Sequence, residues 1–191
     1  MIKYEELYED VKKILSEKRF KHTEGVVKRA VEYAKIYNID IETVKLAAVA
    51  HDIAKEFSEE ENIKYICEYK IELDDIEKLN HNLLHAKIGA AICKNKYGFT
   101  EDMVNSIKFH TTGRENMSTL EKIIYLADAT EENRKYCPAH YIETIKEDID
   151  KGMVEISKWV INRLIEINEI IHLDTIMCYN YYNKILKGND E

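Results

Sequence analysis

Apolar residues recur along most of the chain three and four positions apart, which is the spacing of one face of an α-helix. The strict alternation of a half-buried strand is not found, and neither is a hairpin signal. The pattern predicts helices at roughly residues 3–16, 23–37, 41–56, 58 onward, 83–98, 101–113 and 120–134, a loop or short helix at 72–82, and two or three amphipathic helices at 141–187. We therefore predict an all-α fold in a single domain over residues 1–191, without repeats or linkers.

Residues with capping chemistry mark the ends of these helices. Asp40 can cap the helix that follows it, and the spacing of Ser58 with Glu61 and of Ser118 with Glu121 is that of a capping box. Glycines are expected to end three helices: Gly98, Gly113 and Gly188.

The composition fits a soluble globular protein and limits its partners. Of 191 residues, 45% are hydrophobic and 34% are charged, with one proline and six glycines, so long helices are expected. No stretch is apolar enough to cross a membrane or to form a secretory signal, and the four cysteines form no CxxC pair, which predicts free thiols in the cytoplasm. The net charge of −8 argues against nucleic-acid binding and means that an anionic ligand would need a local cation.

The segment "AVAHDIAKE" places two polar residues in an apolar, alanine-rich pattern. His51 shares a helical face with Val44, Ala47 and Ala48, so it should point inward, and Asp52 follows directly. A lone inward histidine is usually a satisfied core residue. An adjacent buried carboxylate changes this interpretation, because burying it without a cation costs several kcal/mol.

Asp128 repeats this feature on the apolar face of the predicted helix at 120–134. It could pair with a basic residue such as Arg134, or it could bind a metal ion. His22, His85 and His110 also lie on or near apolar helical faces, although each alone would more often be structural. Together these nitrogen and oxygen ligands suit iron, manganese, cobalt or zinc better than magnesium or calcium. His140 and His172 are interpreted as structural or surface residues.

The segments that carry these residues resemble those of a known family. The ordered series His22, His51-Asp52 and Asp128 resembles the HD-domain metal-dependent phosphohydrolases. The match is more specific to YqeK-type HD proteins, which are similar to symmetrical diadenosine tetraphosphate hydrolases. It rests on the runs "RFKHTEGVV", "AHDIAKE", "LLHAKIGA", "IKFHTTGRENMSTLEKIIYLAD" and "EENR".

The resemblance implies a helical HD core at about residues 18–135 and a helical C-terminal extension at about 141–187. It implies one metal ion, or two, with iron expected first, held by His22, His51, Asp52 and Asp128. It gives catalytic roles to Asp52, His85 and His110. The implied substrate contacts are Arg19, Phe20, Lys21, His22, Lys55, His85, His110, Thr111, Asp128 and Arg134.

The family's activity would then be hydrolysis of diadenosine tetraphosphate into two ADP. The expected partners are a dinucleoside polyphosphate and an ADP- or GDP-like product, with no nucleic acid and no membrane, and a homodimer is allowed. His85 and His110 could bind a second ion or act on the phosphates, and Lys55 could reach a bound anion or simply be solvated. Two residues beside the site depart from the family's sequence pattern. Glu132 stands where the family usually has a proline, and Thr130 stands where it usually has an aliphatic residue.

Three alternatives remain open at this point. The chain could be an HD phosphohydrolase acting on another nucleotide, or an HD domain that senses a nucleotide without turnover. It could also be a structural helical bundle that happens to contain several histidines.

Overall fold

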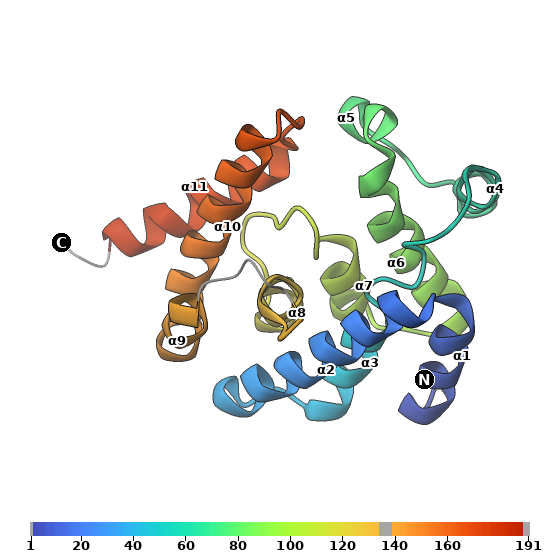
Figure 1. The fold of residues 1–191 in the computed structure, drawn as a ribbon, viewed down its shortest axis with the longest axis horizontal. Helices are drawn as coiled ribbons and strands as arrows, with labels where there is room; N and C mark the ends of the chain where they lie inside the picture. Colours follow the sequence, from blue (N-terminus) through green and yellow to red (C-terminus); the bar gives the residue numbers. More distant parts are fainter. Residues whose placement is uncertain (1, 134–138, 189–191) are drawn as a thin grey trace.

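A computed structural model describes residues 2–133 and 139–188, and throughout these residues the regular structure is helical (Figure 1). The helices are α1 (Tyr4–Ile14), α2 (Glu17–Tyr37), α3 (Ile41–Ala50), α4 (Glu59–Tyr69), α5 (Asp75–Leu79), the short 3-10 helix η1 (His81–Leu83), α6 (Leu84–Tyr97), α7 (Glu101–Lys108), α8 (Thr119–Thr130), α9 (Ala139–Glu147), α10 (Ile149–Glu166) and α11 (Leu173–Gly188). The all-α prediction is confirmed. No helix within the described residues is long and apolar enough to cross a membrane.

Helix α3 lies at the centre of the fold. It packs against α1, α2, α7 and α8, and six of its ten residues are buried and apolar. Three of the six are alanines, whose short side chains let the neighbouring helices approach closely. A helix that is apolar on nearly all sides is stable only when it is covered on nearly all sides. The end of α3 is therefore enclosed by other helices, and His51 follows directly.

The remaining helices cover this centre from two sides (Figure 1). On one side α6 packs against α7, and α4 packs against α6. On the other side α9 and α11 each pack against α10, and α9 and α10 contact α8. The predicted C-terminal helices are thus present and cover one side of α8.

Local signals predicted most helix boundaries correctly, with informative exceptions. The caps at Asp40, Ser58 and Ser118 form as expected, and Gly98 ends α6 with a φ of 68°. The second helix begins at Glu17 instead of about Thr23, because the Ser16 side chain accepts a hydrogen bond from the Arg19 amide. His22 therefore lies inside α2 and not at its start.

Three of the predicted helices end earlier than expected, and one of them, α8, stops at Thr130 instead of at about residue 134. Helix α3 stops at Ala50, and the chain continues in tight turns in which the Ile53 and Lys55 amides donate to carbonyls three residues earlier. Helix α7 stops at Lys108, before His110 and well before Gly113. His51 and His110 therefore each lie just after the end of a helix. His140, just before the helices predicted at 141–187, lies in α9.

Candidate metal centre

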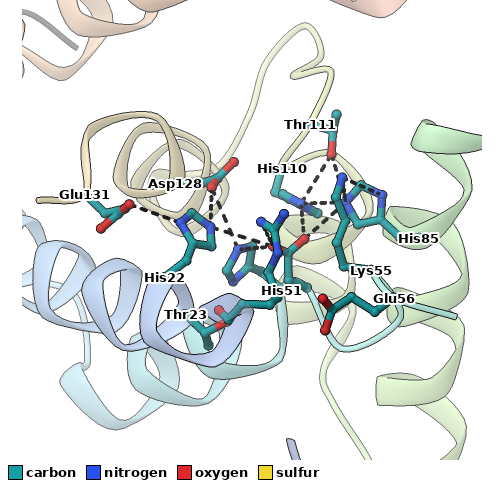
Figure 2. A network of polar contacts seen from close by, with 12 residues as sticks. His22, Thr23, His51, Lys55, Glu56, His85, His110, Thr111, Asp128 and Glu131 are labelled. Atoms are coloured by element: carbon teal, nitrogen blue, oxygen red, sulfur yellow. Dashed lines mark hydrogen bonds and ion pairs between the residues drawn. The ribbon is translucent and has the colours of Figure 1, made fainter. Parts of the chain in front are cut away.

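Six side chains that can bind a metal converge from five parts of the chain (Figure 2). They are His22 on α2, His51 and Asp52 after α3, His85 in the first turn of α6, His110 after α7, and Asp128 on α8. His51 is fully buried, and Asp52, His85 and His110 are each at most 4% exposed. The interior of a protein tolerates this many polar groups only when they are paired with one another or with a cation.

Three of the histidines are held in the same tautomer. The Nδ1 atoms of His51, His85 and His110 each donate to a backbone carbonyl three residues earlier, at 2.7, 2.8 and 2.7 Å. A carbonyl oxygen can only accept, so each Nδ1 carries the proton and each Nε2 presents a lone pair. This is the orientation of a metal-binding histidine whose other nitrogen is anchored.

The first group of donor atoms comprises His22, His51, Asp52 and Asp128. The His22 Nε2 lies 3.0 Å from Asp128 Oδ1, and the His51 Nε2 lies 3.4 Å from Asp52 Oδ2. Two further separations, His22 to Asp52 and His51 to Asp128, are 3.7 and 3.9 Å. Ligands about 2.0–2.2 Å from a common ion are separated from one another by about 3–3.5 Å. The two shorter separations match this spacing, and the donor atoms form two overlapping sets of three, His22–His51–Asp128 and His51–Asp52–His110, within each of which all atoms lie within 4.8 Å of one another.

The His51 Nε2 supports this assignment. This atom is buried and has no hydrogen-bond partner among the described residues. A buried nitrogen lone pair without a partner is costly, and a bound cation removes that cost. This geometry is compatible with the metal-binding role that the family resemblance implies for His22, His51, Asp52 and Asp128, and that role stays a prediction.

Asp52 divides its two oxygens between two groups of histidines. Its Oδ2 belongs to the first group, whereas its Oδ1 lies 3.3 Å from His85 Nε2 and 3.6 Å from His110 Nε2. The latter two nitrogens are 3.2 Å apart, so a proton or a second cation must separate their lone pairs. A carboxylate in this position can bridge two ions.

The protonation states agree with ligand roles. Burial alone would raise the pKa of Asp52, but its contacts with His51, His110 and His85 hold that pKa well below its usual range. Burial lowers the pKa of His85 to about 4, with nearby Lys55 acting in the same direction and Asp52 opposing it. Asp52 is thus ionised and His85 neutral near pH 7, as metal binding requires.

Glu131 is a participant that the sequence did not reveal. Its Oε1 lies 3.1 Å from His22 Nδ1, while its Oε2 accepts from the Asn133 amide and side chain at 2.7 and 2.9 Å. It lies one turn beyond Asp128 and is 3% exposed. An anchored carboxylate of this kind orients a histidine toward a metal and increases its basicity.

Gly25 makes room for this carboxylate. A Cβ at this position would come closer than 3.0 Å to the Glu131 Oε2 and within 3.2 Å of its Cδ. Gly25 lies in the interior of α2, where glycine costs about 0.5–1 kcal/mol relative to alanine. A glycine inside a helix, three residues after His22, is a sequence signal that another group lies close to the helix backbone at that position.

Cationic side chains line the opening beside the metal ligands. A cleft of about 220 Å³, which we call the central cleft, is bordered by Arg19, Lys55 and Thr111, together with Tyr125 and Trp159. Arg19 donates to Asp52 at 3.1 Å, and Lys55 Nζ lies 3.4 Å from His85 Nδ1. The cleft thus combines positive charge with an aromatic wall, which suits the phosphates and the base of a nucleotide.

Three expected substrate contacts, Phe20, Lys21 and His22, are not among the residues that line this cleft. Phe20 is buried in the core against the ring of Tyr8, with ring centroids 5.0 Å apart, and Lys21 is exposed on α2. Arg134 lies outside the described residues. Their roles as substrate contacts stay predictions.

The two departures from the family pattern have structural explanations. The buried Thr130 hydroxyl donates to Leu126 O at 2.7 Å and lies 2.8 Å from the Tyr33 hydroxyl, so a polar side chain is accommodated. Glu132 is exposed and pairs with Lys28 at 2.6 Å. Neither residue is among the metal-binding groups.

A second acidic and histidine cluster lies apart from this centre. His172 Nε2 lies 2.7 Å from Asp74, and Glu77 pairs with Lys87 beside a cavity of about 410 Å³. The His172 Nδ1 accepts from the Asp174 amide, which places the proton on Nε2. These groups satisfy one another, consistent with a structural role for His172.

The fold and the site together define a class of protein. The HD-domain family model matches residues 19–133, the part of the chain that carries His22, the His51-Asp52 pair and Asp128. The chain belongs to the HD-domain family. The expected HD assignment is confirmed.

Particular members of this family are similar over nearly the whole chain. "Bis(5'-nucleosyl)-tetraphosphatase, symmetrical" from Halalkalibacterium halodurans is 38% identical over 172 residues, covering 89% of this chain and 91% of that protein. The protein of the same name from Bacillus subtilis is 34% identical, covering 93% and 96%. The crystal structure of a "predicted HD superfamily hydrolase involved in NAD metabolism" from Clostridium acetobutylicum is 36% identical, with a TM-score of 0.90, covering 96% and 98%.

Proposed function

We propose that this protein is a metal-dependent phosphohydrolase that cleaves diadenosine tetraphosphate symmetrically into two ADP. The observation that carries the proposal is the position of Asp52, whose two oxygens face two groups of histidines beside a cationic cleft. The similarity to symmetrical tetraphosphatases over about nine-tenths of the chain supports the same reaction.

The resident ion is proposed to be iron, with manganese, cobalt or zinc as substitutes. His22, His51, Asp52 and Asp128 would hold it, and His85 and His110 would complete a second position that shares Asp52. When bound, such an ion lowers the pKa of a coordinated water to about 7 and polarises a phosphoryl oxygen. Measuring the metal content of the purified protein tests the identity and number of ions.

The chain's own residues position the substrate and offset its charge. Arg19 and Lys55 border the central cleft, where their positive charges would stabilise the polyphosphate chain. Thr111 Oγ1 lies 3.2 Å from His110 Nε2, so the two could act together on a phosphoryl oxygen or the departing phosphate. We propose that Arg134 adds a further positive charge.

The reaction exchanges one phosphorus–oxygen bond for another. The oxygen of water bonds to one inner phosphorus, and the bond from that phosphorus to the central bridging oxygen breaks. The bridging oxygen leaves with the second ADP, and the proton released by water passes to solvent or to that phosphate. Hydrolysis in oxygen-18 water should therefore yield only ADP, with the label in one molecule of each pair. ATP and AMP as products would refute symmetrical cleavage.

A panel of other nucleotides separates this proposal from its competitors. Because the Clostridium protein is described as involved in NAD metabolism, NAD is included beside nucleoside tetraphosphates and mononucleotides. Faster turnover of any of these would favour another HD phosphohydrolase. Tight ADP binding without turnover would favour a sensor, although none of the expected metal-binding residues is missing from the sequence.

Two further proposals concern the state of the protein. Cys67, Cys93 and Cys178 are free thiols, which supports a reducing cytoplasm as its location. A homodimer is proposed as well, and sedimentation of the purified protein at several concentrations tests it.

A further inference from the structure

A second cleft adjoins the metal centre at Lys55 and His85. This side cleft has a volume of about 230 Å³, and it shares Lys55 and His85 with the central cleft. The two clefts therefore meet at the residues that we assign to the polyphosphate chain. Each cleft alone is smaller than the roughly 300–1,000 Å³ of most small-molecule sites, whereas the two together fall within that range.

The side cleft has the chemistry of a nucleoside site. Phe57 lines it, and its ring stacks on Tyr65 with centroids 5.3 Å apart at 20°. Tyr65 in turn stacks on Tyr69 at 5.9 Å, so Phe57 is the end of a supported aromatic series. Nucleobases stack on such rings regardless of sequence, because every base has a flat π face.

Polar groups in the side cleft favour a nucleoside over a further phosphate. The Asn62 Oδ1 is a buried acceptor without a hydrogen-bond partner among the described residues, and Asn62 lines the cleft. An exocyclic amine of a base would satisfy it. Glu59 also lines the cleft, and its carboxylate suits ribose hydroxyls but would repel a phosphate. Among the described lining residues, Lys55 at the junction is the only lysine or arginine.

We propose that the side cleft binds the second nucleoside of the dinucleoside tetraphosphate, with its base against Phe57 and its phosphates passing Lys55 into the central cleft. This inference rests on the proposed function. Symmetrical cleavage requires the two halves of the substrate to extend in opposite directions from the bond that breaks. Trp159 and Tyr125 offer an aromatic wall to the first half, and Phe57 offers one to the second.

The test compares substrates that carry two nucleosides or one. Phe57→Leu and Asn62→Ala are measured with diadenosine tetraphosphate and with adenosine 5'-tetraphosphate, the latter as substrate or competitive inhibitor. We expect the KM for the dinucleotide to rise about tenfold in Phe57→Leu, the size of a lost base stack, with little change in kcat. The KM or inhibition constant of adenosine 5'-tetraphosphate should stay nearly unchanged, because the single base of this compound occupies the central cleft.

Two further variants serve as controls. Tyr69→Leu changes an aromatic residue of the same stacked series that does not line the cleft, and it should leave both constants unchanged. Trp159→Ala, on the central cleft, should weaken both compounds. Thermal unfolding establishes that each variant is folded, and Asn62→Ala supplies the test if Phe57→Leu is not.

The outcomes separate the two proposals. If the unchanged protein releases ADP from the dinucleotide and neither Phe57→Leu nor Asn62→Ala alters its KM, the side cleft is not a nucleoside site and the proposed function stands. If a variant weakens the binding of both compounds equally, the assignment of the side cleft to the second nucleoside is also overturned. If the unchanged protein does not cleave the dinucleotide at all, the proposed function fails and the second subsite fails with it.

Discussion

Replacing Gly25 by alanine tests whether Glu131 holds His22 in its metal-binding orientation. The added Cβ would come closer than 3.0 Å to the Glu131 Oε2, a separation that Cβ atoms essentially never show. The carboxylate cannot simply swing into solvent, because it is 3% exposed and bonded to Asn133 and His22. Glu131 must therefore withdraw or the helices must separate.

Two opposing effects decide the size of the result. In the interior of a helix, alanine instead of glycine stabilises a protein by about 0.5–1 kcal/mol. Against this, a shift of Glu131 lengthens its 3.1 Å contact with His22 Nδ1, which is already near the upper limit of about 3.2 Å for such a bond. Losing an anchoring partner of a metal ligand typically costs about 10–100-fold in metal affinity or activity. We expect Gly25→Ala to lose at least about tenfold in metal affinity.

The assay is a titration of the first metal site against a competing chelator, together with turnover at saturating metal. Gly188→Ala is the matched control, because a Cβ at this end of α11 would meet nothing within 4 Å. In a protein that already carries Glu131→Ala, adding Gly25→Ala should reduce the metal affinity little further. Gly25→Ala acts by displacing the Glu131 side chain, which is absent from that protein. Unchanged metal affinity in Gly25→Ala, with the stability gain alone, would refute this reasoning.

Three further predictions concern the site and the stability of the fold. Asp52→Ala should lose both metal and turnover, as measured by metal analysis and ADP release, and full retention of both would contradict the metal assignment. His110→Ala should reduce turnover far more than occupancy of the first metal site, and an empty first site would instead place His110 among its ligands. Hydrogen bonds from the Glu77 amide and His172 outweigh burial and lower the pKa of Asp74 to about 2. Because this pKa lies below the unfolded value, Asp74 contributes stability above about pH 4 that is lost as the pH falls toward 2. The deficit of Asp74→Asn in chemical denaturation, about 1 kcal/mol or less for this partly exposed group, should therefore shrink over that range, and a constant deficit would contradict the linkage.

The helices of this protein could be predicted from the sequence because their signals are local. The three-and-four spacing of apolar residues and the caps at Asp40, Ser58 and Ser118 act within one or two turns of the chain. The inward direction of His51 followed from the same spacing. Helix ends were less predictable, since the turns after Ala50 and Lys108 depend on how the following residues are enclosed.

The membership of the metal centre followed from side-chain chemistry and from the family pattern. His22, His51, Asp52 and Asp128 carry the signals of polar groups on apolar helical faces, and the structure places His22, His51 and Asp128 in one set of neighbouring donors and His51, Asp52 and His110 in another. Arg19 and Lys55, which the family pattern also indicated, border the central cleft.

Tertiary structure alone decided how these groups are used. Asp52 faces two histidine groups because α3, α6 and α7 meet at its two oxygens. Glu131 reaches His22 across 109 positions of sequence, and Gly25 makes that contact possible. The side cleft likewise joins the turn after α3 to α4, η1 and α6. Sequence periodicity sets which face of a helix is buried, but the partner of a buried group depends on the packing of helices that are distant along the chain.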